Sequence, residues 1–217
     1  MGPQQDALPR TCNRRYHGQR LFCRACAAGG HHNAGGTLQL VPQLRSRALL
    51  FHRWNGRLFI LTAFAMSLDG LYLTWARGSA ANLVGAIGIS LNAVLIALCA
   101  TMTWRYARLR QLDRHRQWAL RTYLLVNGVW FFRVMLMAWI LLNGGPVGMS
   151  HGNGPVDLLL AFADSLLPLA VLDLYLRSQK SRRSPQKVVM AIVLGLLTLL
   201  MGVGIFGAFK ALWSPLL

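Results

Sequence analysis

Residues 187 to 209 read KVVMAIVLGLLTLLMGVGIFGAF, and no charged residue interrupts the chain between Lys187 and Lys210. A helix of about 20 apolar residues crosses the hydrocarbon core of a bilayer, so this stretch predicts a transmembrane helix. Four more stretches share its length and apolar character, at residues 57 to 76, 83 to 104, 121 to 142 and 156 to 176. We therefore predict an all-α fold, a polytopic transmembrane helical bundle of about five spans.

The chain is strongly basic, with 23 Lys and Arg against 6 Asp and Glu. These charges alternate between successive connections. Residues 105 to 120 and 177 to 186 are rich in Arg and Lys, residues 77 to 82 contain only Arg77, and residues 143 to 155 contain neither. The positive-inside rule then predicts a cytoplasmic N-terminus. We expect the positive charge to face membrane lipids and their anionic headgroups, and not nucleic acid.

Residues 1 to 35 differ from the rest, because they are polar, basic and lack apolar periodicity. We interpret them as a disordered or misassigned segment before a transmembrane domain at residues 36 to 217. Within them Cys23-Arg-Ala-Cys26 lies near further possible zinc ligands, Cys12, His17, His31 and His32. A single C-x-x-C pair does not close a tetrahedral zinc site. We therefore expect no metal site.

A short pattern recurs at the start of two spans. His52-Arg53-Trp54-Asn55-Gly56-Arg57 leads into the first span, and His115-Arg116-Gln117-Trp118-Ala119-Leu120-Arg121 leads into the third. The simplest interpretation is that Trp and Arg anchor a helix end among lipid headgroups. A second is that the four guanidiniums bind an anionic headgroup or ligand at the inner face. A third is that His52 and His115 are axial ligands of haem b in a haem- or quinone-associated redox protein.

These two motifs follow a third run, Gly35-Gly36-Thr37-Leu38-Gln39-Leu40-Val41-Pro42-Gln43-Leu44-Arg45. With the three motifs in this order, the chain resembles the bacterial predicted membrane proteins grouped as domain of unknown function 2306. The resemblance extends from about Gly35 through the fourth span. It implies a multi-pass helical protein of the inner (plasma) membrane, with no established activity. Members of that family have apolar sequence before the Gly35 run, so we expect an upstream span to be missing here.

Three charged residues lie inside the apolar spans, Asp69, Arg133 and Asp164. An unpaired charge at such a depth costs at least about 2.5–3.5 kcal/mol, so each needs a partner. Counting about 1.5 Å per residue from the outer helix ends gives all three a similar depth. This predicts an Arg133–Asp164 pair, with Asp69 as a second carboxylate and Asn92 as a polar neighbour. Pro168 also leaves the backbone carbonyl of Asp164 without its helical donor.

Two functions remain open for this predicted intramembrane cluster. It handles a small molecule, proton or ion, or its charges only hold the helices of a structural or lipid-interacting protein together, as Asn92 and Asn127 do by hydrogen bonds. Asp173, nearer the cytoplasmic end, is expected to pair with Arg57 or Arg121.

The sequence favours a protein that is not an enzyme. It contains no Glu, no Ser/His/Asp order, no H-E-x-x-H and no P-loop. The run Gly202-Val-Gly204-Ile-Phe-Gly207 matches a dinucleotide-binding pattern by letter, but an apolar helix lacks the strand which that motif requires. We expect these glycines to allow close helix contact. Cys99, inside a span, is expected to be a packing residue.

Overall fold

The computed structural model describes residues 36, 48–78, 80, 82–150, 152–181 and 184–212. Within these ranges it contains six helices and no strand, which confirms the all-α prediction. The helices are α3 (Leu49–Trp75), α4 (Leu83–Arg108), α5 (Leu112–Val126), α6 (Gly128–Asn143), α7 (Pro155–Lys180) and α8 (Ser184–Leu212). The chain divides into two compact units, residues 1–62 and 63–217, and the boundary falls inside α3.

Four of these helices, α3, α4, α7 and α8, are each long and apolar enough to cross a membrane. The helices α5 and α6 pass the same test together, and they bend by 54° where they meet. The predicted five spans are therefore present, the third of them as a bent pair. Large apolar side chains stay exposed along α8, among them Val188, Val189, Ile192, Leu196 and Leu199. Such a surface suits lipid contact and not water.

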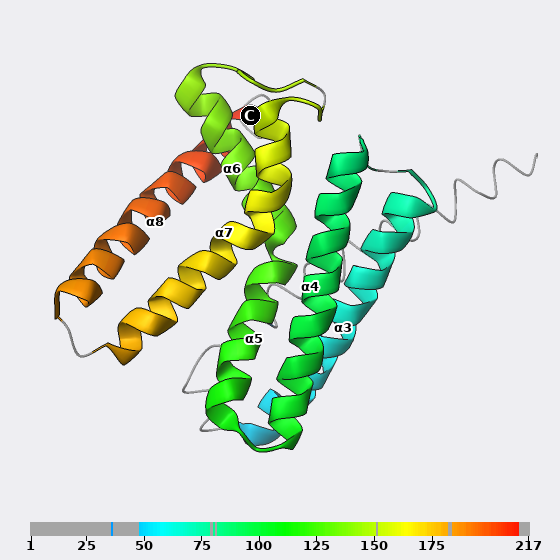
Figure 1. Cartoon of the computed structure of the whole chain (residues 1–217), viewed down its shortest axis with the longest axis vertical. Helices are drawn as coiled ribbons and strands as arrows, with labels where there is room; N and C mark the ends of the chain where they lie inside the picture. Colours follow the sequence, from blue (N-terminus) through cyan, green and yellow to red (C-terminus); the bar gives the residue numbers. More distant parts are fainter. Residues whose placement is uncertain are drawn as a thin grey trace, which may run out of the picture. The chain divides into compact units, whose positions relative to one another are not determined.

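In the second unit, α4 and α7 begin at the same end and run in the same direction (Figure 1). The α5–α6 pair and α8 run back in the opposite direction (Figure 1). The most extensive packing joins α4 to α5 and α6 to α8, whereas α7 contacts all four of these helices. The helix α7 is therefore the common wall of the two helix pairs.

Glycines bring the backbones of these helices close together. A Cβ on Gly204 of α8 would overlap the carbonyl oxygen of Val134 in α6, and one on Gly207 would lie 3.3 Å from the carbonyl oxygen of Met137. A Cβ on Gly88 of α4 would lie 2.6 Å from the carbonyl oxygen of Ala161 in α7. Gly204 and Gly207 of the G-x-G-x-x-G run thus allow close helix packing, as the sequence predicts, whereas a Cβ on Gly202 would meet no atom within 4 Å.

The connection between α6 and α7 joins the first turns of α4 and α7. The Asp157 carboxylate accepts three backbone N–H groups of this connection at 2.9–3.1 Å, those of Ser150, Gly152 and Gly154. Asn82 caps α4 by accepting the N–H of Gly85 at 2.6 Å. Its amide nitrogen donates to the Gly152 carbonyl and, at 2.7 Å, to Asn153 Oδ1. We call this network the loop clamp.

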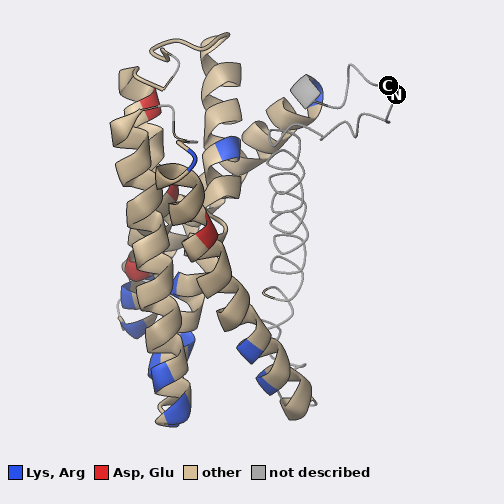
Figure 2. Cartoon of the chain, turned by 90° about the vertical axis from the view of Figure 1, so that its right-hand side faces the viewer, with Lys and Arg blue, Asp and Glu red and all other residues tan. Residues whose placement is uncertain are grey.

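The basic residues gather at the opposite end of α4 and α7. Arg105 and Arg108 lie in the last turn of α4, and Arg177 and Lys180 lie in the last turn of α7. Figure 2 shows these charges at the end away from the loop clamp. The separation agrees with the alternation of charge along the sequence, and the cytoplasmic position of the basic end stays a prediction.

Candidate functional site

The bend between α5 and α6 lies at Asn127 and Gly128, inside the third span. The side-chain amide of Asn127 donates to the carbonyl oxygen of Tyr123 at 2.8 Å. The backbone N–H of Asn127 donates to the carbonyl oxygen of Leu124 at 3.1 Å. Glycine is a poor helix former, and Asn competes for backbone groups. An Asn-Gly pair is therefore a physical cause for a kink. The sequence predicted one span over residues 121 to 142 and did not predict this bend.

The side chain of Asn92 in α4 lies against this bend. A Cβ on Gly128 would lie 3.0 Å from Asn92 Nδ2, so the glycine leaves room for the amide. Asn92 Oδ1 is buried, and within the described part of the chain it has no hydrogen-bond partner. An unsatisfied buried acceptor costs about 1–3 kcal/mol. This oxygen is therefore available to a donor or a cation.

Asp164 and Ser165 of α7 lie at the same level as Asn92. Asn92 and Asp164 each lie nine residues after the start of their helices, about 14 Å along the axis. The close contact of Gly88 with Ala161, one turn earlier on both helices, fixes this register. Asp164 is half-buried and accepts the hydroxyl of the buried Ser165 at 2.8 Å.

Pro168 adds another acceptor near this level. It is buried within α7, and it cannot donate to the carbonyl of Asp164 because it has no N–H. We call Asn92, Gly128, Asp164 and Ser165 the middle polar layer. Within this layer, two helices present acceptors beside the broken ends of a third span.

An apolar layer separates the middle polar layer from the basic end. Ile96 and Ala100 of α4, Leu125 of α5 and Leu172 of α7 are all buried there, at 7%, 0%, 1% and 8% exposure. The helices α4, α5 and α7 pack against one another here, and all four side chains are aliphatic. The predicted packing role of Cys99 agrees with its burial beside Ala100. Buried apolar side chains thus lie along α4, α5 and α7 between the middle polar layer and the basic end.

A second group of polar contacts follows beyond the apolar layer, and we call it the inner polar layer. The hydroxyls of Thr103 in α4 and Thr122 in α5 lie 3.1 Å apart and are buried. Arg121 of α5 binds Asp173 of α7 at 2.6 Å. The sequence predicted a partner for Asp173 among Arg57 and Arg121, and the structure has Arg121 in that place.

His115 joins the inner polar layer through its Nδ1, which lies 3.0 Å from the Thr103 carbonyl oxygen. A carbonyl oxygen only accepts, so Nδ1 carries the proton. In this tautomer Nε2 is the acceptor nitrogen of the ring. This orientation suits both proton transfer and ligation.

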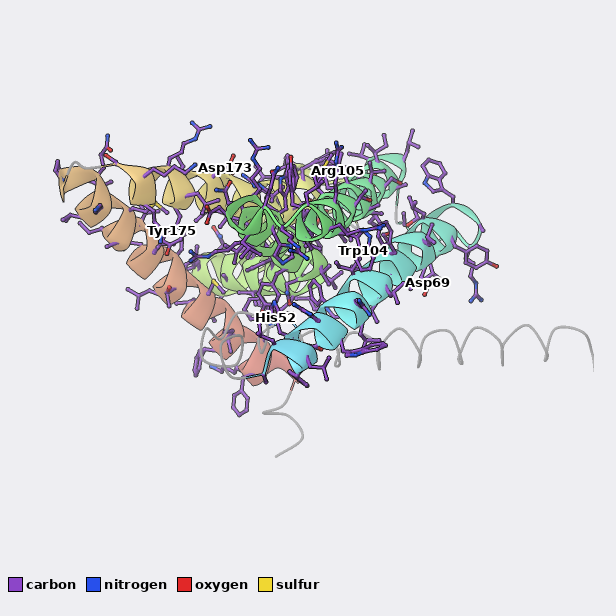
Figure 3. All side chains as sticks on the ribbon, turned by 90° about the horizontal axis from the view of Figure 1, so that it is seen from below. His52, Asp69, Trp104, Arg105, Asp173 and Tyr175 are labelled. Atoms are coloured by element: carbon purple, nitrogen blue, oxygen red, sulfur yellow. The ribbon has the colours of Figure 1, made fainter. Side chains whose placement is uncertain are left out.

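Two residues of the predicted intramembrane cluster lie outside the middle polar layer. Asp69 on α3 and Arg133 on α6 are exposed, and no ion pair within the described ranges includes either of them or Asp164. Figure 3 shows Asp69 well apart from Asp173, on a separate helix. The predicted Arg133–Asp164 pair is therefore not formed. The cluster reduces to Asp164 and Asn92, and Ser165 and Gly128 are added to it.

The two copies of the recurring pattern make the same local contact. The guanidinium of Arg57 stacks over the ring of Trp54 at 5.2 Å, and Arg121 stacks over Trp118 at 5.1 Å. His52 is half-buried, whereas Arg53 and Arg116 are exposed. His52 belongs to the first unit and His115 to the second, so a joint haem site stays a prediction.

The Cys and His residues of the first 35 residues and almost all of the Gly35 run lie outside the described residues. Within the described ranges, no group of three His, Cys, Asp or Glu side chains is placed to hold a metal ion.

The family model described as Predicted membrane protein (DUF2306) matches residues 26–151, which is more than half of the chain. The match contains α3 to α6, with Asn92, Gly128 and His115, and it ends before α7. No curated protein and no solved structure matches the chain.

Proposed function

Because the chain belongs to the DUF2306 family of predicted membrane proteins, it is a multi-pass membrane protein, and we propose that it binds and conducts a small monovalent cation. The binding place is the middle polar layer. The observation that carries this proposal is the buried, unpaired Oδ1 of Asn92, which lies beside a broken span and, by residue count along α4 and α7, at the level of Asp164.

The chemistry of the middle polar layer favours a cation. Asn92 offers a carbonyl oxygen, Asp164 a carboxylate and a backbone carbonyl, and the Ser165 hydroxyl is already donated to Asp164. No Lys or Arg among the described residues is paired with Asp164. An anion would meet like charge there, whereas a proton or Na⁺ would meet acceptors. A single carboxylate and few further oxygens are too few for Ca²⁺, which takes six to eight ligands.

The broken span supports conduction as well as binding. Irregular backbone at membrane depth is tolerated where it is buried in protein or lines a cavity. Broken helices in transporters place free carbonyls and helix ends around a site near the midplane. The Asn127–Gly128 bend and Pro168 are two such interruptions in neighbouring helices. We therefore assign the bend a role in cation passage.

The apolar layer implies that the structure is closed toward the basic end. A cation that leaves the middle polar layer in that direction must pass Ile96, Leu125 and Leu172. Hydrophobic constrictions of this kind gate channels and transporters by excluding water. On this proposal the bundle opens by moving the α5–α6 pair relative to α4 and α7.

The test is a flux measurement on the whole protein in proteoliposomes. One set of vesicles contains a pH indicator and receives a pH step, with potassium and valinomycin to clamp the potential. A second set measures uptake of radioactive Na⁺. We expect the unmodified protein to carry one of the two cations, and Asp164→Asn or Asn92→Leu to slow that flux at least tenfold.

Asp173→Asn is the matched control, since it also removes a carboxylate from α7 but lies in the inner polar layer. It should keep most of the flux. If neither cation moves through the unmodified protein, or if Asp164→Asn and Asp173→Asn behave alike, the proposed cation site is wrong.

The recurring Trp-Arg contacts support a second part of the proposal, an inner-membrane location with anionic lipids at the basic end. Arg57 and Arg121 are each held over a Trp ring three residues earlier. Trp at the headgroup level and Arg beside it bind lipid phosphates well. Binding to vesicles with and without phosphatidylglycerol tests this part.

A redox function is a second candidate, favoured by the orientation of His115. Its Nδ1–H is held by a backbone carbonyl, which is a common arrangement for ligating histidines. A visible spectrum of the purified protein, with and without dithionite, decides this question. A reduced b-type spectrum that disappears in His115→Ala would support haem, whereas a colourless folded protein would remove this candidate.

A further inference from the structure

Asp69 and Arg133 are charged residues of the spans that the proposed cation site does not use. Both side chains are exposed on the surface of the second unit. Neither has an ion pair or hydrogen bond within the part of the chain that the structure describes. Charges within transmembrane segments almost always face a partner or water. Their surroundings therefore require a partner from outside this surface.

The two charges lie a few turns before the ends of their helices. Asp69 is six residues before the end of α3, about 9 Å along its axis. Arg133 is ten residues before the end of α6, about 15 Å along that axis. We take α5 to lie along the membrane normal, and the 54° bend then reduces this length to about 9 Å of depth. Both helices end on the side where the loop clamp lies, so the depths are measured from one membrane face.

The faces around the two charges are suitable for protein contact. Tyr72, on the same face of α3 as Asp69, is 55% exposed, and Trp130, on the face of Arg133, is 39% exposed. Tyr and Arg are enriched at the centres of protein interfaces, with Trp. Each charge thus lies within an exposed face that also carries an aromatic ring.

From these observations we propose that the protein forms a dimer of identical chains, in which Asp69 of one copy pairs with Arg133 of the second. The opposite signs, the depth that this orientation of α5 gives, and the lack of an ion pair for either charge among the described residues select this pairing. A two-fold axis along the membrane normal makes the same contact twice. The proposal is independent of the cation site, since neither residue belongs to the middle polar layer.

The test measures the oligomeric state of the full chain in lipid vesicles at a series of dilutions, by single-molecule photobleaching. We expect a dimer, and at least a tenfold weaker dimerisation for Asp69→Asn and for Arg133→Gln. Exchange of the two charges, Asp69→Arg with Arg133→Asp, should restore the dimer. Such a rescue would show that the single variants lost the charge pair and not their fold. Arg77→Gln, an exposed charge just after α3, is the control and should dimerise normally.

A cross-linking experiment tests the contact itself. One chain carries Asp69→Cys and a differently tagged chain carries Arg133→Cys, both in a background without the natural cysteines. A short bis-maleimide linker should join the two chains. Three results would overturn the proposal. The first is a monomer at every dilution, and the second is a dimer that both single variants leave unchanged. The third is a cross-link that forms within a single chain carrying both cysteines but not between two chains.

Discussion

The amide of Asn92 fills the space that a side chain at position 128 would occupy. Its Nδ2 lies 3.0 Å from where a Cβ of residue 128 would be, so the glycine and the asparagine fit one another across α4 and α6. The Oδ1 on the same amide is buried without a partner. The Gly128 side of the bend and the amide that carries the unpaired acceptor therefore belong to one contact.

Replacement of Asn92 by Leu should stabilise the protein and remove its function. Leu has a similar volume and leaves no buried acceptor unsatisfied, so we expect unfolding to cost about 1 kcal/mol more. Thermal unfolding in detergent and the proteoliposome flux should therefore change in opposite directions. A variant that loses both stability and flux would show that Oδ1 has a structural partner.

Replacement of Gly128 by Leu should displace the Asn92 amide. A side chain at this position meets Nδ2 within van der Waals contact distance, and overpacking typically costs about 1–3 kcal/mol. We expect a lower unfolding temperature together with a loss of flux. Gly70→Leu is the matched control, because no atom lies within 4 Å of a Cβ there. Equal effects at both glycines would argue against a specific fit to Asn92.

The α6–α8 contact should depend on Gly204 and not on its neighbour Gly202. A Cβ on Gly204 overlaps the backbone of Val134, whereas one on Gly202 meets nothing within 4 Å. Gly204→Val should therefore destabilise the fold by about 1–3 kcal/mol or more. Gly202→Val should be nearly neutral. Unfolding in a denaturing detergent distinguishes them, and similar curves would contradict the observed packing.

The Arg121–Asp173 pair should contribute little to stability. Its side chains are 21% and 46% exposed, and such pairs are typically worth less than about 1 kcal/mol. A double-mutant cycle with Arg121→Gln and Asp173→Asn, read by thermal unfolding, should give a small coupling energy that falls with added salt. A large coupling independent of salt would place this pair in the proposed mechanism.

The sequence predicted the spans well, because apolar length alone decides whether a helix can cross a bilayer. It also offered Arg121, as an alternative to Arg57, as the partner of Asp173, because both residues lie near the ends of the predicted spans at residues 121 to 142 and 156 to 176. The family resemblance is confirmed over residues 26–151. These features depend on local composition, and local composition can be read from one chain.

The prediction for Arg133 failed for a different reason. Its depth was counted along a straight span, whereas the bend at Asn127 tilts α6 by 54°. Asn127 was considered only as a hydrogen-bonding residue between helices, although the Asn-Gly pair was a visible signal for a break. The position of Asn92 against Gly128 depends on tertiary packing, and no short pattern in the sequence encodes it.

The loop clamp has a mechanical consequence. Since Asn82 and Asp157 fasten the first turns of α4 and α7 to one connection, these two helices form a rigid frame. The Gly88–Ala161 contact braces that frame one turn above the middle polar layer. In the proposed mechanism α6 moves about the bend at Asn127. The helix α8 moves with α6, because Gly204 packs against Val134. Such a movement of α6 would change access to Asn92, while α4 and α7 would stay in place.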